Sequence, residues 1–322
     1  MSSRKPYGIL ALDHGQGTIK NCDIFENKLA GIKILKEAIP VIHHCSIHDE
    51  LGSGVIVCEH GQGTIEDCEF FHCKKSGIQI YSQGNPIIRR CKIHDVEYGV
   101  KGYDQGQGRI EDCEIFENRY GVDITSEANP HIHGCKIHNN RAHGIDVTGN
   151  GRGEIAECEI IENKDCGVSI SSGSPVIFHC RISANKNHAI KVYQGQGRIE
   201  NCDLRGNGSG AWEIYSKCII KRKNNREDYI IGVLRLSYPI IILSNMVILY
   251  FFRTGVEDMI GNIILCTLIN FFFAILFWID IDEYRKSFIK VGIHFAILII
   301  SIFLSSYFCL YKLLIYSFQN PR

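Results

Sequence analysis

The sequence predicts an all-β parallel β-helix solenoid of about nine coils, followed by an α-helical transmembrane region of three helices. Three observations predict this: nine cysteines spaced 22 or 23 residues apart, short apolar/polar alternations within each interval, and long apolar runs in the last third. A repeat period in the low twenties indicates one supersecondary unit stacked on itself. We define the repeat cysteines as Cys22, Cys45, Cys68, Cys91, Cys113, Cys135, Cys158, Cys180 and Cys202.

Each unit has the same internal pattern around its repeat cysteine. An apolar residue, two variable residues, Cys, a polar residue and an apolar residue lead, about seven residues later, to Gly and an apolar-x-apolar triplet, as in residues 19–24 and 31–34. Short alternations of this kind are typical of strands. Three strands of three to five residues with their turns fill the interval, so we expect coils stacked about 4.8 Å apart.

Glycine and proline mark a second period, twice as long as the first. Gly-x-Gly motifs open alternate coils at Gly15, Gly61, Gly106, Gly151 and Gly195, and the coils between open at Pro40, Pro86, Pro130 and Pro175. Glycine permits positive φ and proline fixes φ near −65°, so two turn shapes alternate along one edge. A nucleotide-binding loop would need a helix after the Gly-x-Gly, and no helical pattern follows.

The residue after each repeat cysteine alternates between acid and base along the chain. In order the positions are Asp23, Ser46, Glu69, Lys92, Glu114, Lys136, Glu159, Arg181 and Asp203. In stacked coils this alternation sets opposite charges side by side, at about 0.2 to 1 kcal/mol per pair. The pattern predicts a charge ladder that fixes the register of the coils on a solvated face.

Histidines and phenylalanines share one position, three residues after the repeat cysteine. His48, His94 and His138 occupy it in the proline-bearing coils, and Phe25, Phe71 and Phe116 occupy it in the glycine-bearing coils. Histidines two coils apart lie about 10 Å from one another, too far to share a zinc ion. A second group, His43, His44 and His48 with Cys45, is scattered by strand alternation. We therefore expect no metal and no cofactor.

Two segments carry a resemblance to a known family. Residues 106–118 (GQGRIEDCEIFEN) and 85–95 (NPIIRRCKIHD) resemble the right-handed parallel β-helix repeats of the pectin-lyase-like superfamily, and within it the repeat domain of F-box-only protein eleven. The resemblance covers about residues 7–215 and implies a right-handed solenoid. In such repeats the cysteine position is usually Asn, which forms a hydrogen-bonded ladder. Here we expect soft thiol packing in its place.

The same resemblance suggests where a catalytic site would lie. Pectin-lyase-like enzymes place catalytic acids, often with a Lys or Arg, on the outer face of one sheet. The corresponding row here reads Lys33, Ile56, Gln79, Lys101, Asp123, Asp146, Ser169, Lys191 and Glu213. Asp123 and Asp146 would be adjacent, with Lys101 beside them, and paired carboxylates can divide acid and base roles. A polysaccharide lyase or hydrolase and a solvated row without catalytic role both remain open.

The F-box relative uses its β-helix to present a substrate to a ubiquitin ligase. In this chain the repeats begin after residues 1–6, and we expect neither an F-box nor a terminal zinc finger. A ligase adaptor is therefore disfavoured, and a binding platform is the role that the resemblance leaves.

Long apolar runs at residues 236–252, 259–279 and 291–311 predict the transmembrane helices. The last two runs each have 21 residues without Asp, Glu, Lys or Arg, close to the roughly 20 that span a bilayer. Cations precede the first run and lie between the second and third, which places the β-helix in the cytoplasm and the C-terminus on the opposite side. Fifteen cysteines without a visible signal peptide favour a reducing compartment and free thiols.

These observations predict three segments and leave two functions open. The segments are a β-helix over 1–216, a basic juxtamembrane linker over 217–228 and a transmembrane region over 229–322. One function is a membrane-anchored cytosolic binding or scaffold module whose face holds a protein, peptide or glycan. The other is a membrane effector whose β-helix senses a ligand and drives homo-oligomerisation of the transmembrane helices. The lipid bilayer is the expected partner, and nucleic acid is not.

Overall fold

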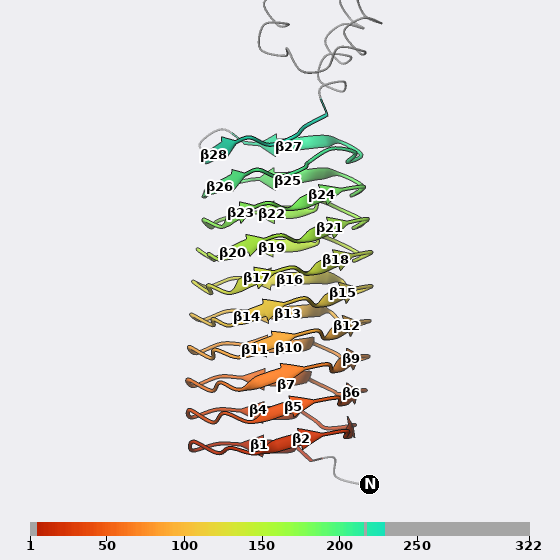
Figure 1. Ribbon diagram of the computed structural model, residues 1–322, viewed down its shortest axis with the longest axis vertical. Coiled ribbons are helices and arrows are strands. Elements are labelled where there is room, and N and C mark those ends of the chain that lie inside the picture. Colours follow the sequence, from red (N-terminus) through yellow and green to blue (C-terminus); the bar gives the residue numbers. More distant parts are fainter. Residues whose placement is uncertain (1–4, 216–217, 229–322) are drawn as a thin grey trace, which may run out of the picture. The chain divides into compact units, whose positions relative to one another are not determined.

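The computed structural model describes residues 5–215 and 218–228. These residues form a parallel β-solenoid of 28 short strands, in which every pairing between strands is parallel. The strands stack as a series of coils from the N-terminal end, where β1 and β2 lie, to the coil of β27 (Figure 1). The predicted parallel solenoid of about nine coils is confirmed, with ten strands in each of two sheets.

Three parallel sheets form the walls of the solenoid, and each full coil contributes one strand to each sheet. Sheet 1 contains β1 (Tyr7–Ala11), β4 (Ala30–Ile34), β7 (Ser53–Val57), β10 (Ser76–Ile80), β13 (Tyr98–Gly102), β16 (Tyr120–Ile124), β19 (Ile145–Val147), β22 (Val168–Ile170), β25 (His188–Val192) and β27 (Gly210–Ile214). Sheet 2 contains β2 (Thr18–Lys20), β5 (Val41–His43), β8 (Thr64–Glu66), β11 (Ile87–Arg89), β14 (Arg109–Glu111), β17 (His131–His133), β20 (Glu154–Ala156), β23 (Val176–Phe178), β26 (Gln196–Glu200) and β28 (Ile219–Lys223). Sheet 3 contains β3 (Asp23–Phe25), β6 (Ser46–His48), β9 (Glu69–Phe71), β12 (Lys92–His94), β15 (Glu114–Phe116), β18 (Lys136–His138), β21 (Glu159–Ile161) and β24 (Arg181–Ser183).

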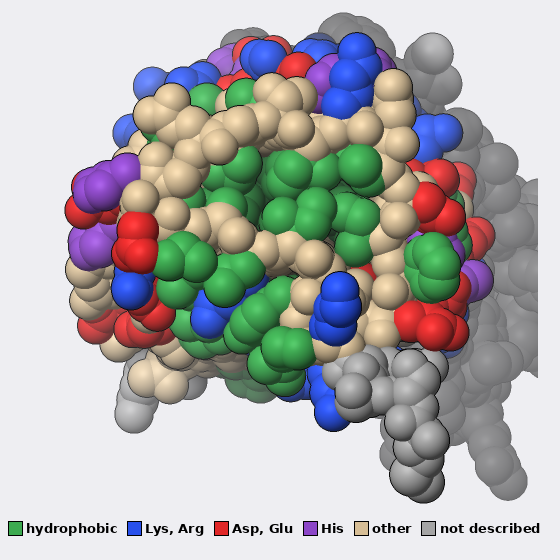
Figure 2. All heavy atoms as spheres, turned by 90° about the horizontal axis from the view of Figure 1, so that it is seen from below, with side chains coloured by type: hydrophobic (Ala, Val, Ile, Leu, Met, Phe, Trp, Pro, Cys, Tyr) green, Lys and Arg blue, Asp and Glu red, His purple; other side chains and the backbone are tan. Residues whose placement is uncertain are grey.

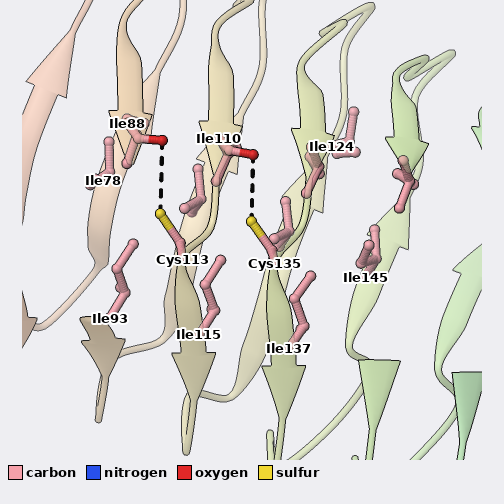
Figure 3. Close-up of a cluster of buried hydrophobic side chains, with 14 of the residues drawn as sticks. Ile78, Ile88, Ile93, Ile110, Cys113, Ile115, Ile124, Cys135, Ile137 and Ile145 are labelled. Carbon is pink, nitrogen blue, oxygen red and sulfur yellow. Dashed lines mark hydrogen bonds between the residues drawn. The ribbon is translucent and has the colours of Figure 1, made fainter. Parts of the chain in front are cut away.

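Isoleucine columns fill the interior of the solenoid. In sheet 2, Ile88 pairs with Ile110, and in sheet 3, Ile93 pairs with Ile115. Isoleucine therefore recurs at the same strand position in neighbouring coils. These side chains point into the core and are fully buried (Figure 3). The short strands alternate one buried residue with exposed or half-buried neighbours, which is the pattern that the sequence predicted.

The repeat cysteines lie at the corner between sheets 2 and 3, and each follows a residue in the left-handed region. Asp112, with φ of 52°, precedes Cys113. The Cys113 thiol donates to the Glu111 carbonyl at 3.2 Å and to the Ile88 carbonyl of the preceding coil at 3.8 Å (Figure 3). The thiols therefore replace amide groups as weak hydrogen-bond donors, in addition to packing in the core.

The last coil shows what the cysteine stands in for. Asn225 occupies the corner position that follows Cys202 in the stack, and its Oδ1 accepts from the Cys202 amide at 3.0 Å. Its Nδ2 donates to the Ile199 carbonyl at 2.9 Å, as the thiols donate to the isoleucine of the coil before them. A cysteine and an asparagine thus fill the same corner with the same acceptor.

A hydrogen-bonded ladder made mostly of asparagines is present at a different corner, in addition to the cysteine corner for which thiol packing was expected. The ladder lies between sheets 3 and 1, five residues after each repeat cysteine, at Asn27, Glu50, Cys73, Val96, Asn118, Asn140, Asn163, Asn185 and Asn207. The Asn163 Oδ1 accepts from the Asn140 amide at 3.1 Å, and the Asn163 Nδ2 donates to the Ile137 carbonyl at 3.3 Å. From Asn118 onward, each asparagine in this way satisfies buried backbone groups of the preceding coil.

The turns between sheets 1 and 2 confirm the alternation of glycine and proline shapes. The second glycine of the first four Gly-x-Gly motifs has positive φ, as at Gly63 with 106° and Gly108 with 118°, whereas in the fifth motif it is the first glycine, Gly195, with 125°. A Cβ at Gly63 would lie 2.5 Å from the Pro40 carbonyl oxygen of the coil below. Glycine is required at Gly63 both by the backbone conformation and by the close approach of the preceding coil.

Part of the expected linker belongs to the solenoid. Residues 219–223, assigned above to the basic linker over 217–228, form β28 and pair with β26 in sheet 2. Arg226 then bridges to Asp203. Ile219 and Ile220 precede three consecutive cations, so the segment is basic in composition and still forms a strand.

The three predicted transmembrane runs, at 236–252, 259–279 and 291–311, lie outside the described residues. Within residues 5–215 and 218–228, no helix is long and apolar enough to cross a membrane. Seen from its N-terminal end, the solenoid shows hydrophobic side chains gathered in the middle and charged residues around them (Figure 2). Ile9, Ala11 and Ile19 of the first coil are accordingly only partly buried.

Candidate functional site

The predicted row of outward residues is present on sheet 1 in the expected register. Lys101 pairs with Asp123, Asp123 pairs with Asp146, and Asp146 pairs with Ser169 in successive parallel strands. The strands β13, β16 and β19 therefore bring the three residues singled out from the sequence side by side. We call Lys101, Asp123 and Asp146 the central cluster.

Lys101 and Asp123 form a close ion pair at the centre of this cluster. The Lys101 Nζ lies 2.7 Å from the Asp123 Oδ2 and 3.9 Å from the centre of the Tyr98 ring. Asp123 is buried, with an exposed fraction of 6%. A solvated row, one of the two interpretations left open by the sequence, therefore does not describe this position. Burial raises the pKa of the Asp123 carboxyl, although the hydrogen bond and the charge of Lys101 act in the opposite direction.

Asp146 differs from Asp123 in its hydrogen bonding. Its Oδ1 is buried and has no hydrogen-bond partner among the described residues. The Asp146 charge also contributes to the raised pKa of Asp123. An acceptor withdrawn from water without a donor is costly, so this oxygen is prepared to accept a hydrogen bond from a bound group.

Tyrosine pairs flank the central cluster on both sides. Tyr98 stacks on Tyr120 with 5.4 Å between ring centres, and Tyr81 stacks on Tyr103 at 4.8 Å. The Gln79 side-chain amide donates to the Tyr103 hydroxyl at 3.0 Å. All four rings are partly buried, and each pair stacks from one coil to the next. The face is thus a strip of hydroxyl, amide, ammonium and carboxylate groups on a rigid sheet.

A groove lies along the turns that follow sheet 1, apart from the central cluster. It has a volume of 540 Å³ and is lined by Asp13, His14, Lys36, Glu37, Glu59, His60, Ser82, Gln83, Asp104 and Gln105. Many of these residues have positive φ, two in succession in each turn. The lining mixes both charges in solvent-exposed turns, which offers little selectivity for a ligand of either charge.

The histidine and phenylalanine position forms a continuous ring stack on sheet 3. Six rings alternate between the two residue types, with successive centres 4.7 to 5.5 Å apart, in the order Phe25, His48, Phe71, His94, Phe116 and His138. The sequence placed these residues in one column, but it did not predict that the rings stack. His48 is held in the stack, so it does not join His43, His44 and Cys45 in a metal site.

A group of potential metal ligands lies just before strands β19 and β22 of sheet 1, although no metal was expected from the sequence. His143, Asp165 and Cys166 each offer a ligand atom, and these atoms all lie within 4.8 Å of one another. Cys166 is not a repeat cysteine, and it takes the place of His143 in the next coil. The signal was present in the sequence, as a cysteine outside the main period that stacks on a histidine.

Comparison with known proteins identifies the family. A family model described as right handed beta helix region matches residues 2–126 and 92–226. A mutant of the periplasmic alginate epimerase AlgG superposes with a TM-score of 0.59 at 15% identity, covering 67% of this chain and 61% of that chain. The A-module of the Azotobacter vinelandii mannuronan C-5 epimerase AlgE6 gives 0.54 at 16% identity, covering 65% and 63%.

These solved structures share a fold with this chain. At such low identity the likeness extends to the fold alone, and the chain spans less than two thirds of the length of either structure. No curated protein sequence matches it. Because the family model covers well over half of the residues, the chain belongs to the right-handed β-helix family.

Proposed function

We propose that this chain is a membrane-anchored binding module whose β-helix holds an extended ligand, in the first place a glycan, along the outer face of sheet 1. The observation that carries this proposal is the Asp146 Oδ1, a buried carboxylate oxygen without a donor among the described residues. A sugar hydroxyl is a donor of suitable size for it. Glycan binding through a few placed polar groups beside aromatic residues is typical of such faces.

The flat repeat of sheet 1 favours a polymer over a compact ligand. Strands β13, β16 and β19 repeat about every 4.8 Å and present Lys101, Asp123 and Asp146 in line. A chain molecule laid across the strands would meet these groups in succession. The solved structures of similar fold are alginate epimerases, which by their names act on a polysaccharide, and this supports a glycan as the first ligand to test.

Binding agrees better than catalysis with the state of the cluster. Lys101 is engaged by both Asp123 and Tyr98, so neither its ammonium group nor the paired carboxylate is available as a proton carrier without breaking the ion pair. The same pair can still donate and accept hydrogen bonds at its remaining lone pairs and N–H groups.

Binding of alginate and of a neutral glucan to the purified full chain, measured by calorimetry, tests the proposal. We expect Asp146→Ala to weaken binding at least tenfold, because the ligand hydroxyl loses its acceptor. The matched control is Glu159→Ala on sheet 3, which also removes an outward carboxylate and is expected to leave affinity unchanged. Equal affinities of the parent and the Asp146→Ala variant, or no binding of either polymer, would refute glycan binding at this face.

A polysaccharide lyase or hydrolase is the second candidate, favoured by the raised pKa of Asp123 beside Asp146. The strand spacing of about 4.8 Å is close to the carboxyl separation of about 5 to 5.5 Å in retaining glycosidases. Release of reducing ends or unsaturated products from alginate would support it, provided that Asp123→Asn and Asp146→Asn together abolish the release. A parent chain that cleaves nothing would end this candidate.

The membrane anchor is proposed from the sequence of residues 229–322. Its support is the pair of 21-residue apolar runs at 259–279 and 291–311. We expect the full chain to remain in the membrane fraction after alkaline extraction, and a chain that ends at residue 228 to be released. The proposed orientation, with the β-helix in the cytoplasm, rests on the flanking cations. The likeness to F-box-only protein eleven stays a prediction from the repeat rhythm.

A further inference from the structure

Sheet 1 brings three different metal-binding groups together at the start of two neighbouring strands. His143 precedes β19, and Asp165 and Cys166 precede β22, which pairs with β19 in parallel. The distance from His143 Nδ1 to Asp165 Oδ2 is 3.7 Å, and the distance from Cys166 Sγ to Asp165 Oδ1 is 3.5 Å. The carboxylate therefore lies within reach of both the imidazole and the thiol.

These separations match those around a tetrahedral zinc ion. With Zn–N and Zn–O bonds of about 2.1 Å and a Zn–S bond of about 2.3 Å, neighbouring ligand atoms lie about 3.4 to 3.6 Å apart. One ligand atom from each of the three residues lies within 4.8 Å of the other two, so the side chains need to close by at most about one ångström to surround one ion. A mixed nitrogen, sulfur and oxygen set selects borderline transition metals over Mg²⁺ and Ca²⁺, which prefer oxygen ligands.

We propose that His143, Asp165 and Cys166 form a binding site for a divalent transition metal ion such as Zn²⁺. The ligands are the His143 Nδ1, one Asp165 oxygen and the Cys166 thiolate, and water completes the fourth position. Binding releases the Cys166 thiol proton to solvent. It also replaces the long hydrogen bond that His143 Nδ1 accepts from the Cys166 amide at 3.3 Å.

A second layer of contacts orients the carboxylate. The Asn187 side-chain amide, from the following coil, donates to the Asp165 Oδ1 at 2.6 Å. Burial raises the pKa of the Asp165 carboxyl, but the Asn187 hydrogen bond and the smaller effects of His143, Cys166 and Lys191 outweigh burial and lower it. Partners of this kind fix a metal ligand in position, and their loss typically costs 10- to 100-fold in metal affinity.

The site adjoins the proposed glycan face but shares no residue with the central cluster. His143 belongs to the column of Tyr98 and Tyr120, since its ring lies 6.1 Å from that of Tyr120, whereas the central cluster occupies the middle of the strands. The Cys166 side chain is buried and His143 is largely buried, whereas Asp165, which is 38% exposed, forms the outer side through which an ion enters. A metal ion bound here would be shielded from solvent on the Cys166 side and open to solvent on the Asp165 side.

Titration of the reduced full chain with Co²⁺ tests the site, because cobalt bound to thiolate gives a near-ultraviolet charge-transfer band that zinc then displaces. We expect the parent to show this band at one equivalent and Cys166→Ala to lose it. The matched control is Cys58→Ala, which removes a buried thiol directly after β7 of sheet 1, separated from the site by β10, β13 and β16. This control should retain the band.

Two further variants separate metal binding from folding. His143→Gln changes a side chain that lies outside the strands. This variant should lower Co²⁺ affinity at least tenfold and preserve the far-ultraviolet circular dichroism of the parent. Asn187→Ala should lower it about tenfold through the carboxylate alone. Zn²⁺ should raise the melting temperature of the parent and not that of His143→Gln. An absent band in the parent, or an equal band in Cys166→Ala, would overturn the site.

Discussion

The imidazole Nε2 of His48 lies 2.8 Å from the Asp23 Oδ1 of the preceding coil. The other ring nitrogen, Nδ1, lies 2.7 Å from the Asp49 Oδ2 of its own coil. One histidine thus joins two carboxylates across two coils while its ring faces pack on Phe25 and Phe71. This contact links the charge ladder to the ring stack.

His48 makes stability depend on pH. Burial lowers the pKa of this histidine, but its hydrogen bonds to Asp49 and Asp23 outweigh burial and raise it. A folded pKa above the unfolded value of about 6.5 means that the contribution is complete below that pH and lost as pH rises through the folded pKa. Chemical denaturation should show the free energy of unfolding falling between about pH 6 and pH 8.

The variant His48→Phe provides the control, because phenylalanine fills this position in the neighbouring coils. It keeps the ring stack and removes the titrating group. The difference in unfolding free energy between the parent and His48→Phe should shrink as the pH rises. A constant difference across this range would contradict the assignment to His48.

Asn163→Val should destabilise the solenoid by about 2 to 4 kcal/mol, because two buried backbone groups lose their partner. These groups are the Asn140 amide and the Ile137 carbonyl, both bonded by the Asn163 side chain. Equilibrium denaturation measures the change. A loss under 1 kcal/mol would mean that the backbone relaxes to find other partners.

The opposite change is predicted at Val96, which interrupts the asparagine ladder. The Val96 amide is bonded by the Asn118 Oδ1, but valine offers nothing to the coil before it. Val96→Asn places a donor and an acceptor toward the Phe70 carbonyl and the Cys73 amide. We expect a gain of about 0.5 to 1.5 kcal/mol in unfolding free energy. A loss would show that the polar side chain is not accommodated there.

Lys101→Met should destabilise the chain by about 2 kcal/mol at neutral pH, because Asp123 would remain buried and charged without its partner. The value is below that of a fully buried pair, since Lys101 is 24% exposed. The raised pKa of Asp123 means that its ionisation on going to higher pH costs stability. The loss should therefore be smaller near pH 4, and Lys101→Met with Asp123→Asn should recover most of it.

Thiol labelling should distinguish the ends of the solenoid from its interior. Eleven of the thirteen cysteines among the described residues are buried, and Cys22 and Cys218, in the first and last coils, are half-buried. We expect these two to react first with a maleimide, and Cys113 to react only after unfolding. Mass spectrometry of the native chain measures the order. Early labelling of Cys113 would mean that the corner opens in the native state.

Three features were predictable from the sequence: the repeat period, the three-strand coil and the register. Each follows from residue types that recur at a fixed interval along the chain. The cysteine spacing placed Lys101, Asp123 and Asp146 in adjacent strands, and the structure agrees. The burial of Asp123 was not predictable, since an outward position on a strand is usually solvated. Asp123 is buried together with the Lys101 side chain, whose ammonium group lies 2.7 Å from the carboxylate.

The asparagine ladder and the metal ligands were missed for a different reason. The ladder begins with Asn27 but then passes through Glu50, Cys73 and Val96, so its period is visible only from Asn118 onward. Cys166 was hidden among cysteines of the main period, and its approach to His143 depends on which coil residues stack, which the sequence pattern shows only once the corner is known.

The alternation of His48 and Phe71, like that of Glu69 and Lys92, means that two coils form the smallest exchangeable unit of this rod. Loss or gain of a single coil would set histidine on histidine and base on base, or phenylalanine on phenylalanine and acid on acid, at the junction. Loss or gain of a pair would restore every contact. The solenoid is therefore expected to change length during evolution in steps of about 45 residues, twice the 22- to 23-residue spacing of its cysteines.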